Sequence, residues 1–353
     1  MATVRLPGLI DIHVHLRDPG GTHKEDFSSG TAAALAGGFV GVVDMPNNMP
    51  PVVDKSSLAK KLSLASLKAR CDFAFYMGAA ADNARDPVAG PHIAGLKMYL
   101  DQTYGPLRVA TLPVLMAHFS SWPKDKPIAV HAEGLSTAAA IGLARAYDRH
   151  LHVCHVSRQA EIELIRQAKE SGARISCEVT PHHLFLTEDD AKALGSLALM
   201  RPTLATLKDQ QALWQNLEVF DAVASDHAPH TLAEKRGDNP PPGVPGLETT
   251  LPLLLDAASA GRLSLERIVQ LLRHGPAAVL NLRLSEEAYV EVDPRATWTI
   301  QGSELFTKCG WTPFEGLRVH GRVHEVSLRG SKVYSQNEGV LAAPGSGRPL
   351  AVV

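Results

Sequence analysis

The chain has 353 residues, a formal net charge of −2 and hydrophobic residues at 45% of its positions. This length suits one large α/β domain of about 250 residues with a smaller appendage. Acidic and basic residues are mixed along the chain, which argues against nucleic acid or a membrane surface as a partner, so we expect a small molecule.

The N-terminus and the cysteines favour a soluble, cytoplasmic protein. The segment MATVRLPGLI is too short for a signal peptide, and no apolar run reaches the ~18 residues that span a membrane. Cys71, Cys154, Cys177 and Cys309 are widely spaced and form no CxxC pair. This spacing argues against a disulfide framework and indicates a reducing compartment.

Eight short β-rich runs follow one another along the chain, with helix-like segments between several of them. The predicted strands are residues 8–15, 39–45, 71–78, 93–100, 127–132, 150–156, 173–179 and 220–227. Of the amphipathic segments 133–149 and 157–172, the second opens on Ser157 as a helix N-cap and stops at Gly172. The pattern predicts a (β/α)₈ TIM-like barrel, with an open doubly wound sheet as the alternative.

The pattern changes after about residue 285, where polar and apolar residues alternate between turn signals. We therefore predict a barrel over residues 6–285 and a small β-rich unit formed by residues 1–5 and 286–353. The segment APGSGRPL near the C-terminus reads as an irregular terminus or a linker. Only twelve residues precede His13, which suggests either a domain excised from a longer polypeptide or a shortened β-unit.

Polar side chains lie at or near the ends of five predicted strands: His13, His15, Lys97, His131, His155 and Asp226. In GLIDIHVHLRDPGG, His13, His15 and Arg17 share one face because strand side chains alternate. Barrel enzymes keep their active sites at the C-terminal ends of the strands. Each residue alone could be a core side chain or a turn cap, but together they predict a metal centre.

Lys97 needs a separate explanation, because an ammonium group repels a cation. Its apolar surroundings, AGLKMYL, favour the neutral amine, which can react with carbon dioxide to give a carbamate. A carbamate offers one anionic oxygen to each of two metal ions. A buried ion pair or a Schiff-base lysine are the alternatives. Asp226 could bind a metal through one oxygen and move a proton with the other.

The motifs DIHVHLRDPG, MPN, GLKMYL, ASDHAPH and PPPGVPGLET resemble those of dihydroorotases in the amidohydrolase superfamily. The resemblance covers nearly the whole chain and is closest to the dihydroorotase domain of CAD, the multifunctional protein of pyrimidine synthesis. It implies the reversible cyclisation of N-carbamoyl-L-aspartate to L-dihydroorotate.

The resemblance also implies the roles of individual residues. One zinc ion would be held by His13, His15, Asp226 and carboxylated Lys97, and a second by Lys97, His131 and His155, with a bridging hydroxide. Asp226 would be the general base and acid. The implied substrate-binding residues are Arg17, Asn47, Thr103, Arg201, His230 and Pro242, with Gly243 beside the last. For Arg201 the alternative is a surface ion pair. Tyr104 stands where the family has phenylalanine, so its hydroxyl needs a partner when the loop closes.

Several alternatives remain open at this point. Cys154 and Glu178 could bind a third zinc ion near His13, although Cys154 could equally be a packed apolar side chain. His182 and His183 match no ligand position, and we expect them to be structural. Allantoinases and dihydropyrimidinases share the ligand pattern, but Arg17 with Asn47 favours a ring that carries a carboxylate.

A catalytically inactive scaffold domain is the alternative from a different functional class. The family resemblance further implies a homodimer, and neighbouring carbamoyl phosphate synthetase and aspartate transcarbamoylase domains are conceivable partners.

Overall fold

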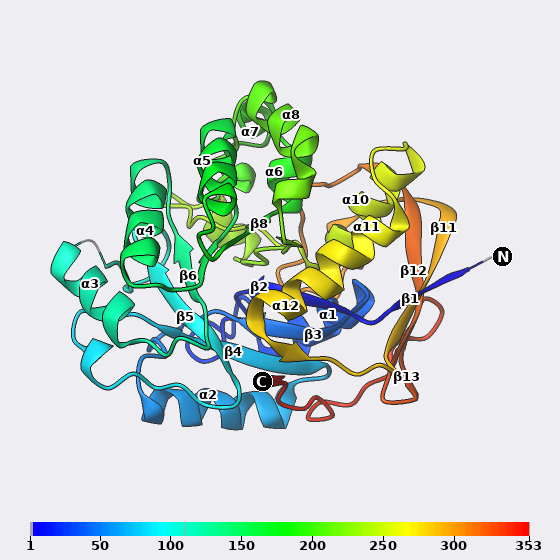
Figure 1. The fold of residues 1–353 in the computed structure, drawn as a ribbon. Helices are drawn as coiled ribbons and strands as arrows, with labels where there is room; N and C mark the ends of the chain where they lie inside the picture. The colour runs from blue at the N-terminus through cyan, green and yellow to red at the C-terminus, as the bar shows by residue number, and fades with distance from the viewer. Residues whose placement is uncertain (1–2, 110, 353) are drawn as a thin grey trace.

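A computed structural model describes residues 3–109 and 111–352 (Figure 1). Eight parallel strands form one sheet whose spatial order follows the chain. The strands are β2 (Leu9–Val14), β3 (Phe39–Asp44), β4 (Asp72–Gly78), β5 (Ile93–Tyr99), β6 (Ile128–His131), β7 (Leu151–Val153), β8 (Ile175–Val179) and β9 (Ala222–Val223). The sheet closes because Val14 pairs in parallel with His227, and the His15 N–H donates to the His227 carbonyl at 2.8 Å. This confirms the predicted TIM-like barrel and rules out the open sheet.

The eighth strand is much shorter than the predicted segment 220–227, for a local reason. The backbone N–H of Ser225 donates to the side-chain carboxylate of Asp11 in β2, at 3.1 Å from Oδ2, and not to a backbone carbonyl. Asp226 then has a φ of +45°, which no strand residue adopts. The chain therefore leaves the sheet just before the carboxylate of Asp226, which turns towards the barrel mouth.

Within residues 3–109 and 111–352, twelve α-helices surround and extend the barrel, as Figure 1 shows. They are α1 (Phe27–Ala36), α2 (Lys55–Lys68), α3 (Leu112–Ser121), α4 (Leu135–Ala146), α5 (Gln159–Glu170), α6 (Pro181–Phe185), α7 (Glu188–Leu194), α8 (Leu207–Gln215), α9 (Leu232–Lys235), α10 (Leu247–Ser259), α11 (Leu265–Val269) and α12 (Gly275–Leu280). A π-helical turn, Gln270–His274, joins α11 to α12.

The predicted cap of α5 is wrong by one residue, because Arg158 and not Ser157 occupies the N-cap position. The side chain of Glu161 explains this start, since it accepts from the backbone N–H groups of Ser157 and Arg158, both at 3.2 Å. At the other end Gly172 has a φ of +82°, so it stops the helix as predicted.

A second, antiparallel sheet packs beside the barrel, in the order β1-β11-β12-β13-β14. Its strands are β1 (Val4–Pro7), β11 (Tyr289–Thr299), β12 (Arg318–Leu328), β13 (Ser331–Ser335) and β14 (Gly339–Val340). The N-terminal strand β1 therefore pairs with a strand from the other end of the chain. The exact division at residues 5/6 and 285/286 stays a prediction.

The C-terminal segment APGSGRPL contains no helix or strand, as its composition predicts, but it is bound to the barrel. Strand β15 (Ala351–Val352) pairs with β10 (Leu282–Arg283). At the start of β4, the Phe73 carbonyl accepts from the Leu350 N–H at 2.7 Å, and the Phe73 N–H donates to the Arg348 carbonyl at 3.0 Å. The side chain of Leu350 is 6% exposed and packs in the cluster of apolar residues that includes Ile10 and Val43. Gly347 allows the backbone of this segment to approach the backbone of Cys71, because a Cβ at position 347 would lie only 2.1 Å from the Cys71 carbonyl oxygen.

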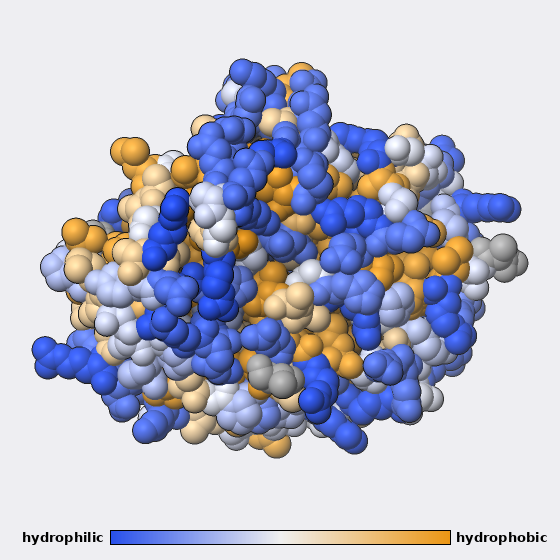
Figure 2. Space-filling view, in the orientation of Figure 1, coloured by the Kyte–Doolittle hydropathy of each residue, from blue (hydrophilic) through white to orange (hydrophobic). Residues whose placement is uncertain are grey.

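The surface combines hydrophilic and hydrophobic side chains on the face drawn in Figure 2, and the protrusion around α7 and α8 is mostly hydrophilic. Exposed apolar side chains include Leu112 and Met116 on α3 and Leu135 on α4. Among the helices that the structure describes, none has the length and apolar character needed to cross a bilayer.

Candidate active site

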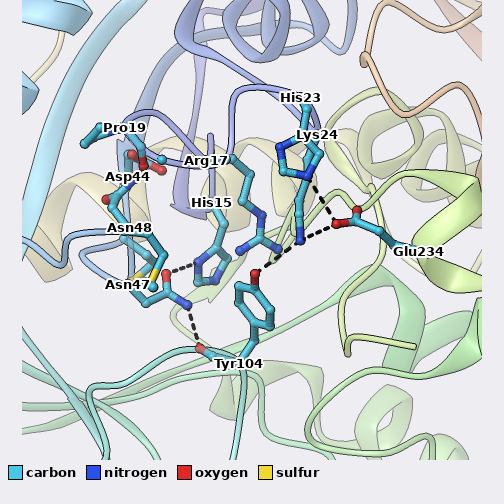
Figure 3. Close-up of a pocket in the computed structure, with 14 residues that line it drawn as sticks. His15, Arg17, Pro19, His23, Lys24, Asp44, Asn47, Asn48, Tyr104 and Glu234 are labelled. Carbon is cyan, nitrogen blue, oxygen red and sulfur yellow. Dashed lines mark hydrogen bonds and ion pairs between the residues drawn. The ribbon is translucent and has the colours of Figure 1, made fainter. Parts of the chain in front are cut away.

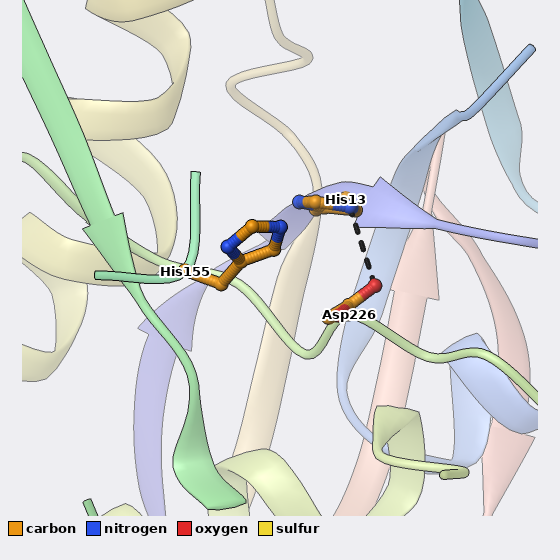
Figure 4. Close-up of side chains that lie close together, drawn as sticks. All are labelled: His13, His155 and Asp226. Atoms are coloured by element: carbon orange, nitrogen blue, oxygen red, sulfur yellow. Dashed lines mark ion pairs between the residues drawn. The ribbon is translucent and has the colours of Figure 1, made fainter. Parts of the chain in front are cut away.

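The barrel brings the predicted metal ligands together at its C-terminal mouth. His13 lies in β2, Lys97 in β5 and His131 at the end of β6. The other three follow the ends of β2, β7 and β9 by one to three residues: His15, His155 and Asp226. All six are buried. Figure 4 shows His13, His155 and Asp226 converging from three separate segments. A parallel barrel produces this arrangement because every strand ends at the same rim.

Asp226 is the centre of one half of this cluster. Its Oδ1 atom lies 3.2 Å from His13 Nε2 and 3.1 Å from His15 Nε2. Burial on its own raises the pKa of Asp226, but His13 and His15 outweigh it and hold that pKa well below its usual value. Burial lowers the pKa of His15 to about 3, although Asp226 opposes the shift. The group thus contains an anionic carboxylate that faces the neutral His15 ring, which suits a cation.

His131 and His155 form the other half. His131 Nδ1 lies 2.9 Å from His155 Nε2, and burial lowers the pKa of both rings. Within the described residues, His131 Nε2 and His155 Nδ1 are buried without a hydrogen-bond partner. Buried ring nitrogens without a partner are uncommon, because each one costs desolvation energy. A metal ion would give such nitrogens a partner.

Lys97 is fully buried and lies between these groups. Within the part of the chain that the structure describes, its Nζ makes no ion pair, and its hydrogen-bond partner is Cys154 Sγ at 2.9 Å. The alternative of a buried ion pair therefore receives no support. An amine without a counter-ion in an apolar setting is the form that a carbamate requires.

Two groups of side chains could hold a metal ion. His13, His155 and Asp226 form one, and His13, Cys154 and Glu178 form the other. The second contains the pair suspected of a third ion, and Glu178 is hydrogen-bonded to His13 Nδ1. Nitrogen, sulfur and carboxylate ligands are those that Zn²⁺ prefers. The donors and the unpartnered ring nitrogens therefore fit a metal centre.

Arg17 borders the cavity beside the histidines and contacts His230. Arg17 is buried, its Nε donates to the Pro229 carbonyl at 3.1 Å, and its Nη2 lies 3.1 Å from His230 Nε2. Arg17 has a φ of +60°, which turns its side chain away from the strand direction. A guanidinium group held in this way can bind a carboxylate with two parallel hydrogen bonds.

The segment that resembles the family's loop covers the pocket. Asn47 Oδ1 lies 2.6 Å from His15 Nδ1, and Asn47 Nδ2 donates to the Tyr104 carbonyl at 3.0 Å (Figure 3). Thr103 and Tyr104 border a cavity of about 30 Å³ beside the histidines. Asn47 thus orients a predicted ligand and fastens the loop, in addition to its predicted place in the pocket.

Three further predicted residues border the same cavity. Arg201 lies there, and no carboxylate pairs with its guanidinium among the described residues, so the surface ion pair is not observed. The backbone of Pro242 and Gly243 also lines the cavity, but it is already engaged. The Pro242 carbonyl accepts from His230 at 3.0 Å, and Gly243 N–H donates to Leu199 at 2.9 Å.

The structure also identifies residues that sequence reasoning missed. The buried Lys24 contacts His230 and Tyr104, while the buried Lys61 donates to the Met45 carbonyl at 2.6 Å. Lys235 donates to the Gly243 carbonyl at 3.0 Å and so supports the Pro242 loop. No spacing rule reveals such lysines, because they act singly from turns and helices. The predicted structural histidine His183 bonds Thr180 and the Pro202 carbonyl.

With this geometry in place, comparison with known proteins identifies the family. The model of the amidohydrolase family matches residues 4–286. The chain belongs to the amidohydrolase family. This amidohydrolase is 51% identical to "Multifunctional protein CAD" of Squalus acanthias over 98% of its length, and it spans 16% of that protein. It is 36% identical to "Dihydroorotase" of Pyrococcus abyssi, covering 94% of this chain and 84% of the relative.

Solved structures agree on the fold of this amidohydrolase. An L-hydantoinase (dihydropyrimidinase) from Arthrobacter aurescens superposes with a TM-score of 0.92 at 25% identity, covering 99% of this chain and 89% of the other. An inactive dihydroorotase-like domain of a Chaetomium thermophilum CAD-like multifunctional protein gives 0.84 at 27% identity, covering 99% of each chain.

Proposed function

We propose that this amidohydrolase is a dihydroorotase, which interconverts N-carbamoyl-L-aspartate and L-dihydroorotate. The observation that carries the proposal is Arg17, a buried guanidinium held beside the six clustered metal-ligand candidates. A cyclic amide with a carboxylate substituent matches both parts of this site. The likeness to relatives named dihydroorotase supports the same substrate.

The proposed metal centre contains two zinc ions, one held by His13, His15, Asp226 and Lys97, and the other by Lys97, His131 and His155. Lys97 is carboxylated in this proposal and bridges the ions. When bound, the ions lower the pKa of water towards neutrality and stabilise charge on the carbonyl oxygen. A third zinc ion at His13, Cys154 and Glu178 is the weaker part of the proposal, supported by their proximity.

Asp226 moves the proton in both directions of the reaction. Its Oδ1 faces His13 and His15, which leaves Oδ2 for the attacking water. In ring opening, Asp226 takes the proton from that water and delivers it to the departing ring nitrogen. Ring closure reverses these steps and releases water.

Arg17 and Asn47 would bind the substrate carboxylate, and His230 would complete this pocket through its contact with Arg17, while Arg201 borders the same cavity. The backbone at Pro242 faces the ring amides, and Thr103 closes over the bound substrate from the loop. Loop closure excludes water other than the one that reacts. Thr103 and Tyr104 of this loop border the cavity beside the histidines, which supports a role for the loop in covering the bound substrate.

Parallel assays separate dihydroorotase from its relatives. Zinc-loaded protein supplied with bicarbonate is offered L-dihydroorotate, allantoin and dihydrouracil. We expect turnover of L-dihydroorotate alone, because the two other rings lack the carboxylate that Arg17 binds. Turnover of dihydrouracil or allantoin at a comparable kcat/KM would instead support the hydantoinase-like relatives as the functional model.

A non-catalytic domain is the second candidate, because a similar fold occurs in the inactive dihydroorotase-like domain. The presence of all six ligand candidates and Arg17 favours catalysis. The CAD match supports a multidomain setting, and we infer a homodimer from the family resemblance. Carbamoyl phosphate synthetase and aspartate transcarbamoylase domains are proposed neighbours. Four buried, unpaired cysteines support a cytoplasmic location.

A further inference from the structure

Lys24 lies at the barrel mouth outside the metal cluster, in the turn that follows β2. Its backbone N–H donates to the Gly21 carbonyl at 2.9 Å, and its side chain is buried beside a cavity of about 180 Å³ (Figure 3). Lys24 Nζ lies 3.2 Å from the Tyr104 hydroxyl, 3.0 Å from His230 Nδ1 and 3.0 Å from Glu234 Oε1. An ammonium group has three donors, so all of them are used.

These contacts determine which nitrogen of His230 carries hydrogen. Lys24 can only donate, so His230 Nδ1 must accept, and the neutral ring then carries its hydrogen on Nε2. The Pro242 carbonyl lies 3.0 Å from Nε2 and accepts that hydrogen. Burial lowers the pKa of His230, and the charges of Arg17 and Lys24 lower it further, so the ring is neutral.

The tautomer of His230 in turn determines whether the terminal nitrogens of Arg17 are free to donate to a ligand. Arg17 Nη2 lies 3.1 Å from His230 Nε2, but a nitrogen that already carries hydrogen cannot accept from it. The Nε group of Arg17 is fixed by the Pro229 carbonyl. The terminal guanidinium nitrogens are therefore left for a ligand. Without Lys24, His230 could adopt the other tautomer and accept a hydrogen bond from Arg17.

Lys24 also fastens the loop above the pocket. The Tyr104 ring packs edge-on against His230 with centroids 4.9 Å apart, and the Arg17 guanidinium carbon lies 5.1 Å from the ring centroid. The hydroxyl that distinguishes Tyr104 from phenylalanine finds its partner in Lys24. One side chain thus connects the turn after β2, the loop after β5 and the segment after β9.

We propose that Lys24 is a positioning residue that prepares the carboxylate-binding pocket. It holds His230 with hydrogen on Nε2, keeps Arg17 free for the substrate and fastens Tyr104 over the site. This inference rests on the proposed function for its kinetic consequence, because that consequence requires a substrate with a carboxylate. Its consequence for His230 does not depend on activity.

The test uses Lys24→Met, which keeps the side-chain length and removes the three donors. In protein labelled with ¹⁵N-histidine, the His230 signals are assigned by their loss in His230→Gln. We expect the wild type to show hydrogen on Nε2, and Lys24→Met to shift the population towards Nδ1. For L-dihydroorotate, KM should rise about tenfold with a much smaller change in kcat, as for a lost charge-assisted contact in substrate binding.

Two variants make the test specific. Tyr104→Phe removes only the loop contact and should leave the His230 tautomer unchanged. Lys308→Met is the matched control, because Lys308 Nζ also makes an ion pair, with Asp26 at 3.0 Å, but lies outside the pocket. Lys308→Met should change neither the His230 tautomer nor KM for L-dihydroorotate. If Lys24→Met does not fold, Lys24→Leu, which also lacks a hydrogen-bond donor, replaces it.

An unchanged His230 tautomer in the Lys24 variant would overturn the inference, as would an unchanged KM in an active enzyme. A wild type that fails to turn over L-dihydroorotate would refute the proposed function. The histidine spectra would still decide whether Lys24 controls the tautomer.

Discussion

In the proposed mechanism, the carboxylate of Asp226 has two roles that need opposite protonation states. As a metal ligand it must stay ionised, and the adjacent His13 and His15 favour that form despite burial. As a base it must accept a proton briefly from water. The positive φ of Asp226 allows both, because it turns the carboxylate out of the sheet and leaves one oxygen free of the histidines.

Replacing Asp226 with asparagine should therefore show how much of the activity depends on the negative charge of this side chain and not on its shape. The amide keeps the size of the side chain but removes the anionic ligand and the base. We expect kcat for L-dihydroorotate to fall by at least about 10²-fold, the usual contribution of a general base. Steady-state kinetics with the zinc content measured on the same sample provide the check. Activity within threefold of the wild type would exclude Asp226 as the base.

Single residues differed in how far the sequence could predict them. The period-two pattern places His13, His15 and Arg17 on one face, and the barrel then brings the distant histidines beside them. Lys24, Lys61 and Lys235 carry no such periodic signal. Their partners are backbone carbonyls and side chains from remote segments, which only the folded chain brings into contact.

At the scale of elements, helix α10 links the barrel to the chain between β11 and β12. Glu248 at its first turn is buried and accepts from the backbone N–H groups of Phe306 at 2.9 Å and Thr307 at 3.0 Å. Burial nevertheless dominates and raises the pKa of Glu248 to about 8 from its ordinary 4.5. The sequence could not predict this contact, because nothing in it pairs residue 248 with a loop so distant along the chain.

This carboxyl group should make stability depend on pH. Because its folded-state pKa is raised, its contribution is fully present below about pH 4.5 and is lost as the pH rises through about 8. We expect the free energy of unfolding of the wild type, relative to Glu248→Gln, to decrease between these values. Urea denaturation across that range measures the difference. A difference that stays constant or increases with pH would contradict the shift.

The strand pattern was predictable because buried parallel strands are short apolar runs, and eight of them imply a barrel. The residues at which the strands end were harder to predict. Strand β9 stops after Val223 because the Asp11 carboxylate accepts from the Ser225 N–H, a contact between the first and last strands of the barrel that no local propensity encodes. The cap of α5 likewise depends on Glu161, whose carboxylate selects the start of the helix.

At the scale of the whole molecule, segments near both ends of the chain pack against distant parts of the fold. Strand β1 joins the antiparallel sheet through β11, and the segment around Leu350 packs against the barrel at the start of β4. The Gly- and Pro-rich composition predicted the irregular backbone of this segment but not its packing against the barrel. In this chain the glycine permits a close approach of backbones, and the leucine that follows supplies the buried contact.

Truncating Leu350 to alanine should destabilise the fold by about 2–5 kcal/mol, the range for buried leucines. Leu341→Ala is the matched control, because Leu341 is 43% exposed, and it should cost less than about 1 kcal/mol. Chemical denaturation of both variants gives the comparison. Equal effects would show that the C-terminal segment does not stabilise the barrel.

The central claim is that a carboxylated Lys97 completes the metal centre of a dihydroorotase. The most direct measurement is the rate of L-dihydroorotate opening by zinc-loaded wild type and Lys97→Ala, each with and without acetate. We predict turnover by the wild type, loss in the variant and partial recovery with acetate, which can supply the missing bridging oxygens. A wild type that holds zinc but shows no turnover would contradict the account and favour a non-catalytic domain.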